Sequence, residues 1–79
     1  MKQANKLNSN QINPAKLLLS KWTATVPRNK EKHFLVTRIS EDELGIIVTC
    51  TLEAVLTKQE YEIDWHDLKD NSRWLAGWL

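Results

Sequence analysis

The sequence predicts a single small, mostly β domain (small α+β), in which four antiparallel strands form a strongly curved sheet or a small open barrel. A short N-terminal helix and a C-terminal helical turn are expected to close its ends. Three observations lead to this prediction: apolar and polar residues alternate along residues 45–65, a shorter stretch alternates at 21–26 and an apolar stretch follows at 33–39, and polar turn sequences separate them. The chain has 79 residues, close to the lower limit for a domain with one core.

The N-terminal part is expected to contribute one short helix. Residues 1–12 show no periodicity and are predicted to be a disordered lead to a single domain at 13–79. Asn13-Pro14 is a good helix start, because Asn caps free backbone N–H groups and Pro fits the first helical position. We therefore predict a helix that ends at about Ser20.

Two strands are expected before the main hairpin. The first is predicted at 21–26, with Trp22 on its apolar face. The second, at 33–39, is apolar on both faces, with Phe34 and Val36 on one and Leu35 and Ile39 on the other. Such a strand is usually covered on both sides, so the helix or the C-terminal tail is expected to supply the second cover. The sequence leaves open which face packs with the hairpin.

The strongest element is a hairpin that turns back at Lys58-Gln59. Its strands, at 45–57 and 60–65, share an apolar face made of Ile46, Val48, Cys50, Leu52, Ala54, Leu56, Tyr61, Ile63 and Trp65. A two-residue loop would give three facing pairs: Leu56–Tyr61, Ala54–Ile63 and Leu52–Trp65. A flat strand of this length would reach about 40 Å, so we expect a bulge or kink near Glu53-Ala54.

The closing segment at 70–79 is expected to form a short helical turn. It starts with residues that cap helices and then places Trp74 and Trp78 at i, i+4 spacing. Trp22 and Trp65 are expected in the core, because the remaining residues on their strand faces are apolar. Exposed aromatic surface is therefore expected at the C-terminal end.

Several blocks of the sequence occur together and in a distinctive order: NPAKLLLSKWTA, NKEKHFLVTR, LEAVLTK followed by EYEIDWHDLKD, and RWLAGWL. With these blocks, residues 13–79 resemble a family of small bacterial tryptophan-rich proteins that is known as conserved and uncharacterised. The resemblance implies no catalytic or binding residues.

The charges of the chain are divided between its two halves. The formal net charge is +1. Residues 1–38 carry eight Lys or Arg and one acid, a net charge of +7, whereas residues 39–79 carry three bases and nine acids, a net charge of −6. The halves either neutralise each other in the fold, or they offer a basic surface to an anionic partner or a head-to-tail contact to a second copy.

Two sets of residues are candidate binding surfaces. A possible surface for an anionic partner consists of Lys21, Arg28, Lys30, Lys32 and Arg38. A possible protein-interaction surface consists of Trp74, Trp78, Glu53, Glu60, Glu62 and Asp64. The predicted hairpin register sets Glu53 opposite Asp64, and like charges that face each other are unfavourable, so we expect a cation nearby, most simply a basic side chain from the first half.

Enzyme chemistry finds little support in the sequence. It contains no Gly-rich phosphate loop and no spaced Cys/His set, so we predict no catalytic, metal-binding or cofactor-binding residue and no cofactor. The lone Cys50 excludes an internal disulfide and fits a cytoplasmic location. The apolar run at 17–19 is too short for a signal peptide core or a membrane span.

These observations predict a small, non-enzymatic binding module for protein interaction or self-association, with a protein partner or a homo-oligomer as its complex. The alternative is a nucleic-acid-binding module that uses the basic loop at 28–32.

Overall fold

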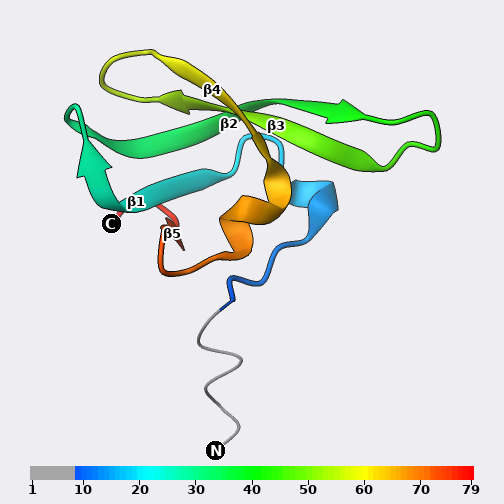
Figure 1. Cartoon of the computed structure of the whole chain (residues 1–79), viewed down its shortest axis with the longest axis horizontal. Helices are drawn as coiled ribbons and strands as arrows, with labels where there is room; N and C mark the ends of the chain where they lie inside the picture. Colours follow the sequence, from blue (N-terminus) through cyan, green and yellow to red (C-terminus); the bar gives the residue numbers. More distant parts are fainter. Residues whose placement is uncertain (1–8) are drawn as a thin grey trace, which may run out of the picture.

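The computed structural model describes residues 9–79, which form one five-stranded antiparallel sheet (Figure 1). In chain order the elements are η1 (Pro14–Lys16), β1 (Lys21–Arg28), β2 (Glu31–Glu41), β3 (Ile47–Ala54), β4 (Glu60–Asp64), η2 (Trp65–Lys69) and β5 (Trp74–Ala76). The strand order is β4-β3-β2-β1-β5. Because β4 and β5 lie at opposite edges, the sheet is open and is not a barrel. The prediction of a mostly β, antiparallel domain is confirmed.

The prediction of four strands with a C-terminal helical turn is wrong in detail, because Trp74–Ala76 forms a fifth strand. It pairs with β1 in the register Trp22↔Ala76 and Ala24↔Trp74. The free edge of β1 supplies backbone partners for this segment, and the Gly77 N–H also donates to Lys21 O at 2.7 Å. A helix of one or two turns is marginal by itself, so these strand hydrogen bonds override the i, i+4 pattern.

The predicted helix to Ser20 is reduced to the 3₁₀ turn η1. Asn13 does cap it, since its Oδ1 accepts a hydrogen bond from the Ala15 N–H at 3.0 Å. The chain leaves helical geometry at Leu19, whose φ is 68° and whose N–H donates to Val36 O at 2.7 Å. A tertiary hydrogen bond thus replaces the next helical one.

A bulge in β2 moves Ile39, which was predicted on the face of Leu35, to the face of Phe34 and Val36. The register of β2 with β3 runs through Val36↔Leu52 and then resumes at Arg38↔Thr51, so Thr37 is the extra residue. After the bulge Ile39 lies opposite the buried Cys50, on the same face as Val36. Phe34, Val36 and Ile39 therefore all contribute to the core side of the sheet.

A second register shift changes the predicted apolar face of β3. It lies between Ser40↔Thr49 and Glu41↔Ile47, and it leaves Val48 unpaired on β3. As a result Ile47 packs against the core, while Val48 is 45% exposed. The bend was expected near Glu53-Ala54, but the two bulges lie farther from the β3–β4 loop.

The predicted pairs of the β3–β4 hairpin are wrong, although the residues that do pair lie on the predicted faces. The observed pairs include Leu52↔Tyr61 and Cys50↔Ile63. The loop is longer than expected: the Ala54 N–H donates to Gln59 O, and the Ala54 carbonyl oxygen accepts from the Lys58 N–H. Because the slip is an even number of residues, the paired residues of β3 and β4 keep their predicted side of the sheet.

The core lies on one face of the sheet, beneath the N-terminal segment and η2. Its buried apolar residues are Leu17, Trp22, Phe34, Val36, Cys50, Leu52, Ala54, Trp65 and Leu68. Residues 9–12, which were expected to belong to the disordered lead, contact the domain: Asn10 Nδ2 donates to Leu68 O at 2.7 Å and to Trp74 O at 2.8 Å. The rest of the predicted lead, 1–8, lies outside the described residues.

Candidate binding groove

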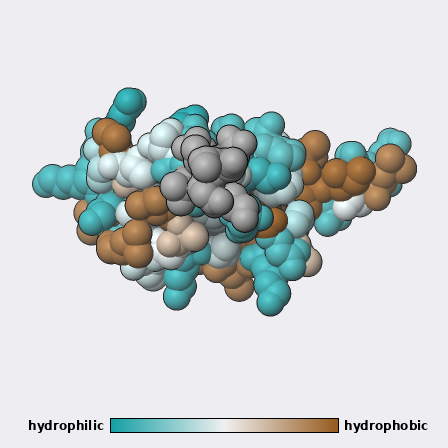
Figure 2. Space-filling view, turned by 90° about the horizontal axis from the view of Figure 1, so that it is seen from below, coloured by the Kyte–Doolittle hydropathy of each residue, from teal (hydrophilic) through white to brown (hydrophobic). Residues whose placement is uncertain are grey.

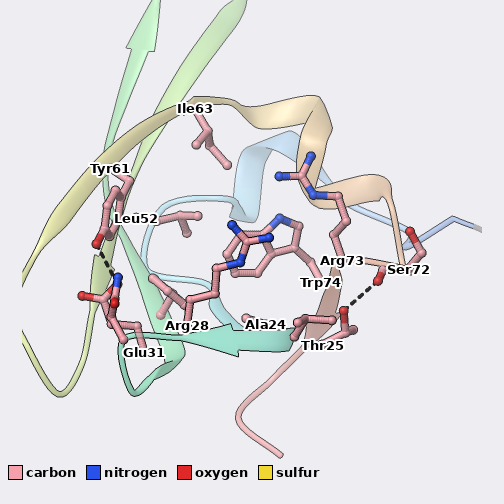
Figure 3. Close-up of a pocket in the computed structure, with 13 residues that line it drawn as sticks. Ala24, Thr25, Arg28, Glu31, Leu52, Tyr61, Ile63, Ser72, Arg73 and Trp74 are labelled. Carbon is pink, nitrogen blue, oxygen red and sulfur yellow. Dashed lines mark hydrogen bonds between the residues drawn. The ribbon is translucent and has the colours of Figure 1, made fainter.

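The covering segments leave part of the core face of the sheet open, and a groove of about 520 Å³ lies there (Figure 3). We call it the aromatic groove. Its apolar lining is formed by Phe34, Leu52, Tyr61, Ile63 and Trp74, and its charged lining by Arg28, Glu31 and Arg73. The groove brings together residues from β1, β2, β3, β4 and β5, so it exists only in the assembled sheet.

Three aromatic rings form the floor of the aromatic groove. The ring of Phe34 meets Trp74 edge-on, with centroids 5.2 Å apart and an interplanar angle of 86°. Tyr61 approaches Phe34 from the other side at 6.3 Å and 63°. Edge-to-face contacts of this kind hold aromatic rings in defined orientations. The floor is therefore a preformed apolar surface.

An ionised carboxylate stands at one end of the groove. Tyr61 Oη donates to Glu31 Oε1 at 2.6 Å, and Thr57 Oγ1 donates to Glu31 Oε2. These two hydrogen bonds, that of Thr57 first, lower the pKa of Glu31 below its usual 4.5. The same carboxylate raises the pKa of Tyr61, chiefly through their hydrogen bond. Both carboxylate oxygens are thus already engaged within the chain.

Two arginines border the groove without an ion pair among residues 9–79, although hydrogen bonds from Ser72 and then the charge of Arg73 lower the pKa of Asp70. Arg28 stands at the end of β1, and Arg73 directly precedes β5 (Figure 3). Both residues are exposed, and within residues 9–79 neither forms an ion pair. A guanidinium group has five N–H donors in a planar fork that matches a carboxylate or phosphate. The aromatic groove therefore combines an apolar floor with two available anion-binding groups.

The five predicted basic residues do not all contribute to the aromatic groove. Lys21 Nζ lies 4.8 Å from the ring centroid of Trp78, and Arg38 pairs with Glu60 at 2.8 Å. Lys30 belongs to the tight β1–β2 turn, where Asn29 and Lys30 have φ of 54° and 64°. Lys32 is exposed on β2. Of the predicted set, only Arg28 lines the groove.

Each predicted acidic residue has a polar partner close by. Glu60 pairs with Arg38, and Glu53 lies 4.0 Å from Lys58 Nζ. Glu62 Oε2 accepts from Thr49 Oγ1 at 3.1 Å. The observed register sets Glu53 opposite Glu60 instead of Asp64, so like charges still face each other. The positive charge beside them comes from both halves of the chain.

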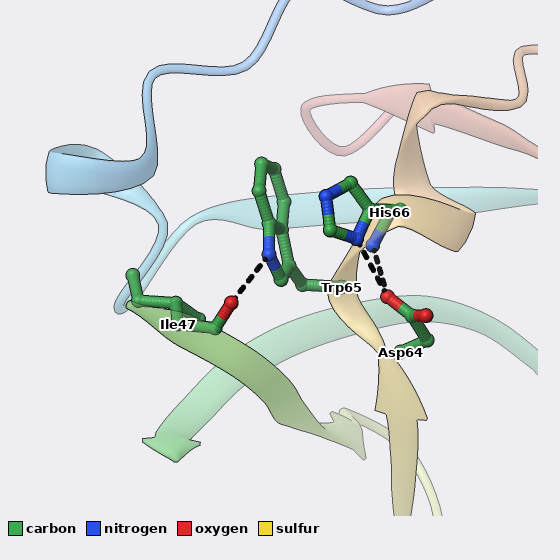
Figure 4. A network of polar contacts seen from close by, with 4 residues as sticks. All are labelled: Ile47, Asp64, Trp65 and His66. Carbon is green, nitrogen blue, oxygen red and sulfur yellow. Dashed lines mark hydrogen bonds and ion pairs between the residues drawn. The ribbon is translucent and has the colours of Figure 1, made fainter. Parts of the chain in front are cut away.

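Asp64 is held at the start of η2 by its neighbour His66 (Figure 4). Its Oδ1 accepts from the His66 N–H at 2.9 Å and lies 2.8 Å from His66 Nδ1. The backbone hydrogen bond, followed by the side-chain one, lowers the pKa of Asp64. Next to it Trp65 is buried and donates from Nε1 to Ile47 O at 3.0 Å (Figure 4). These contacts give Asp64 a structural role at the junction of β4 and η2.

The two C-terminal tryptophans do not share a surface. Trp74 lines the aromatic groove, whereas Trp78 lies beside Lys21 and His33, which are on the opposite face of the sheet from the core residue Trp22. Trp78 is 43% exposed, and its Nε1 donates to Phe34 O at 2.9 Å.

The sequence did not predict Glu31 and Arg73 as groove residues. The one available signal was that Glu31 is the only acid among residues 1–38.

The described residues offer little reactive chemistry. Residues 9–79 contain no group of three or more His, Cys, Asp or Glu side chains placed to hold a metal ion. Cys50 is buried, and burial, followed by the charges of Asp64 and Asp67, raises its pKa to about 11. A thiol with this pKa is almost fully protonated at neutral pH.

Within residues 9–79, no helix has the length and apolar character that crossing a membrane requires.

Comparison with known proteins places this arrangement in a sequence family. A family model described as Tryptophan-rich protein (DUF2389) matches residues 20–79. The match begins just before β1 and includes every residue that lines the aromatic groove. No curated protein and no solved structure matches the chain.

Proposed function

The chain belongs to the tryptophan-rich protein family DUF2389, and from this premise we propose that it is a non-enzymatic protein-interaction module whose aromatic groove binds an apolar, acidic segment of a partner protein. The observation that carries the proposal is the pair Arg28 and Arg73, two guanidinium groups without an ion pair in residues 9–79, at the border of an apolar groove.

The size and chemistry of the groove support a peptide segment as its ligand. Grooves of about 300–1,000 Å³ accommodate ligands of a few side chains, so the aromatic groove at about 520 Å³ suits a short segment. Apolar side chains of that segment would cover Phe34 and Trp74, while its carboxylates would pair with the arginines. Glu31 keeps its negative charge, but two arginines and one carboxylate still give the groove lining a net positive charge, which favours an acidic ligand.

Nucleic-acid binding through residues 28–32 is the alternative, and it receives less support. Arg28 faces the aromatic groove, while Lys21 and Arg38 are engaged elsewhere. A phosphate backbone would need several cations along one path. Retention on heparin that weakens with salt and is lost in the triple variant Arg28→Ala, Lys30→Ala, Lys32→Ala would favour nucleic acid instead.

The direct test is a titration with short peptides, followed by tryptophan fluorescence and by backbone amide shifts. The probe is Asp-Leu-Glu-Phe with blocked ends, compared with Asn-Leu-Gln-Phe and Lys-Leu-Lys-Phe. We expect the acidic peptide to shift the amides of residues that line the groove, the neutral peptide to bind about tenfold more weakly, and the basic peptide not to bind.

Two double variants make this test specific. Arg28→Ala with Arg73→Ala should remove binding of the acidic peptide. Lys16→Ala with Lys32→Ala removes the same number of charges from exposed sites outside the groove and should leave binding unchanged. If the acidic and basic peptides bind equally well, or if both double variants behave alike, the proposal is wrong.

A further inference from the structure

We infer that the partner of the aromatic groove is a second copy of this chain, whose β2–β3 hairpin tip enters the groove. We define the hairpin tip as residues 41–48. This inference rests on the proposed function of the groove. It adds the identity of the bound segment and the head-to-tail direction of the contact.

The hairpin tip exposes three apolar side chains to solvent. Leu44 is 82% exposed, Ile46 58% and Val48 45%. In the space-filling view the end of the molecule that projects to the right is mostly hydrophobic (Figure 2). In Figure 1 the β2–β3 turn forms this right-hand end. The bulge that leaves Val48 unpaired adds it to this surface. Contiguous exposed apolar residues on a small domain commonly mark an interaction site.

The hairpin tip is held in one conformation by its own hydrogen bonds. Asp42 Oδ1 accepts from the N–H groups of Leu44 at 2.9 Å and Ile46 at 3.0 Å, and Asp42 N–H donates to Ile46 O at 2.9 Å. Gly45 has φ of 80°, which lets the backbone turn sharply at this point. A preformed turn loses little conformational entropy when it binds.

The charges of the tip match those of the groove. Glu41 and Glu43 flank the Asp42 turn, and neither forms an ion pair within residues 9–79. The groove has two arginines, Arg28 and Arg73, to pair with these two glutamates. The tip thus has the composition proposed for the ligand, with apolar residues next to carboxylates.

The contact must form between different copies. Arg28 and the hairpin tip lie at opposite ends of the eleven-residue strand β2, which are about 35 Å apart. A contact between two different surfaces leaves one tip and one groove free on every dimer, so further copies can add. The contact area is small, so the association should be weak, with a dissociation constant of about 0.1–1 mM.

Sedimentation of the full chain over a range of concentrations tests the inference. We expect the average mass to rise steadily between about 10 µM and 1 mM, without a plateau at the dimer. The double variant Leu44→Ser, Ile46→Ser should stay monomeric. Leu19→Ser, which replaces a leucine that is 63% exposed at another site, should associate like the parent chain. A monomer at 1 mM, or association that survives in the tip variant, would overturn the inference.

Charge reversal tests the pairing of tip and groove directly. Glu41→Arg with Glu43→Arg, and Arg28→Glu with Arg73→Glu, should each remain monomeric alone, with unchanged circular dichroism. An equal mixture of the two should associate, because the reversed tip fits the reversed groove. If the mixture stays monomeric the inference fails, whereas binding of the acidic peptide to the parent chain would still support the proposed function.

Discussion

The hydroxyl group of Thr23 donates a 2.6 Å hydrogen bond to the carbonyl oxygen of Gly77 and so ties the C-terminal tail to β1. Thr23 Oγ1 in turn accepts from the Leu79 N–H at 3.1 Å, and Thr23 is almost completely buried. Gly77 has φ of 86°, which turns the chain from β5 toward the opposite face of the sheet. There Trp78 covers part of β1 and β2. One buried hydroxyl thus positions the segment that covers the second face.

Replacing Thr23 by Val should therefore destabilise the fold. The variant keeps the shape of the side chain but loses two hydrogen bonds and leaves the Gly77 carbonyl without this partner. We expect a loss of about 1–2 kcal/mol in the free energy of unfolding, measured by urea denaturation. Trp78 should also become more exposed to an aqueous fluorescence quencher.

Thr37→Val is the matched control, for which we expect no loss in the free energy of unfolding. The Thr37 Oγ1 is buried at the β2 bulge and has no hydrogen-bond partner among residues 9–79. Thr37→Val removes an unpaired polar group, so the free energy of unfolding should stay the same or rise by up to about 1 kcal/mol. Equal losses in the two variants would show that the hydrogen bonds of Thr23 do not account for its contribution to stability.

Trp74 should contribute more to stability than Trp78. Trp74 contacts the Phe34 ring and pairs with Ala24 in the sheet, whereas Trp78 is 43% exposed. We expect Trp74→Ala to lower the free energy of unfolding by about 3 kcal/mol and Trp78→Ala by about 1 kcal/mol. The comparison uses thermal and urea unfolding of both variants. A larger loss for Trp78→Ala would mean that the tail, and not the groove floor, holds the sheet edge.

The β1–β2 turn carries backbone strain that a glycine would relieve. Asn29 and Lys30 both have positive φ, the geometry of a type I′ turn, and Gly is strongly preferred at the second position. Lys30→Gly should raise the free energy of unfolding by about 0.5–1 kcal/mol. Lys32→Gly, in the extended backbone of β2, should lower it by a similar amount. A loss in both variants would contradict the turn assignment.

The sequence predicts the parts of this fold that depend on local alternation and misses those that depend on register. Side-chain period alone places Cys50, Leu52 and Ala54 on the core face. The bulge at Thr37 has no local signal, because Thr is compatible with regular and bulged strands alike. Trp74–Ala76 becomes a strand only because the edge of β1 is free, a tertiary effect.

The aromatic groove was missed for the same reason. Arg28 and Arg73 are 45 positions apart in the sequence and become neighbours of one groove through the β1–β5 pairing. Charge composition indicated a basic first half, but it could not separate Arg28 in the groove from Arg38, which pairs across the sheet with Glu60. Which charges remain unpaired is a property of the register, and the register was the least determined feature.

Cys50 makes the stability of the domain depend on pH in the alkaline range. Its pKa is raised from 9.0 to about 11 in the folded chain, first by burial. The fold therefore favours the protonated thiol: this contribution is fully present below pH 9 and is lost as the pH rises through 11. A shift of this size corresponds to about 2–3 kcal/mol of stability, because each unit is worth about 1.4 kcal/mol.

Comparison of the parent chain with Cys50→Ala isolates this effect. Urea unfolding between about pH 8 and pH 10.5 should show the parent chain losing stability faster than the variant, by about 1.4 kcal/mol per pH unit above pH 9. Tyr61, whose pKa is also raised, adds an alkaline loss of the same sign. Since Tyr61 is present in both proteins, its contribution cancels in the difference. Parallel curves for the two proteins would show that the folded chain does not disfavour the thiolate, and that Cys50 is more accessible to water than its position opposite Ile39 and Ile63 implies.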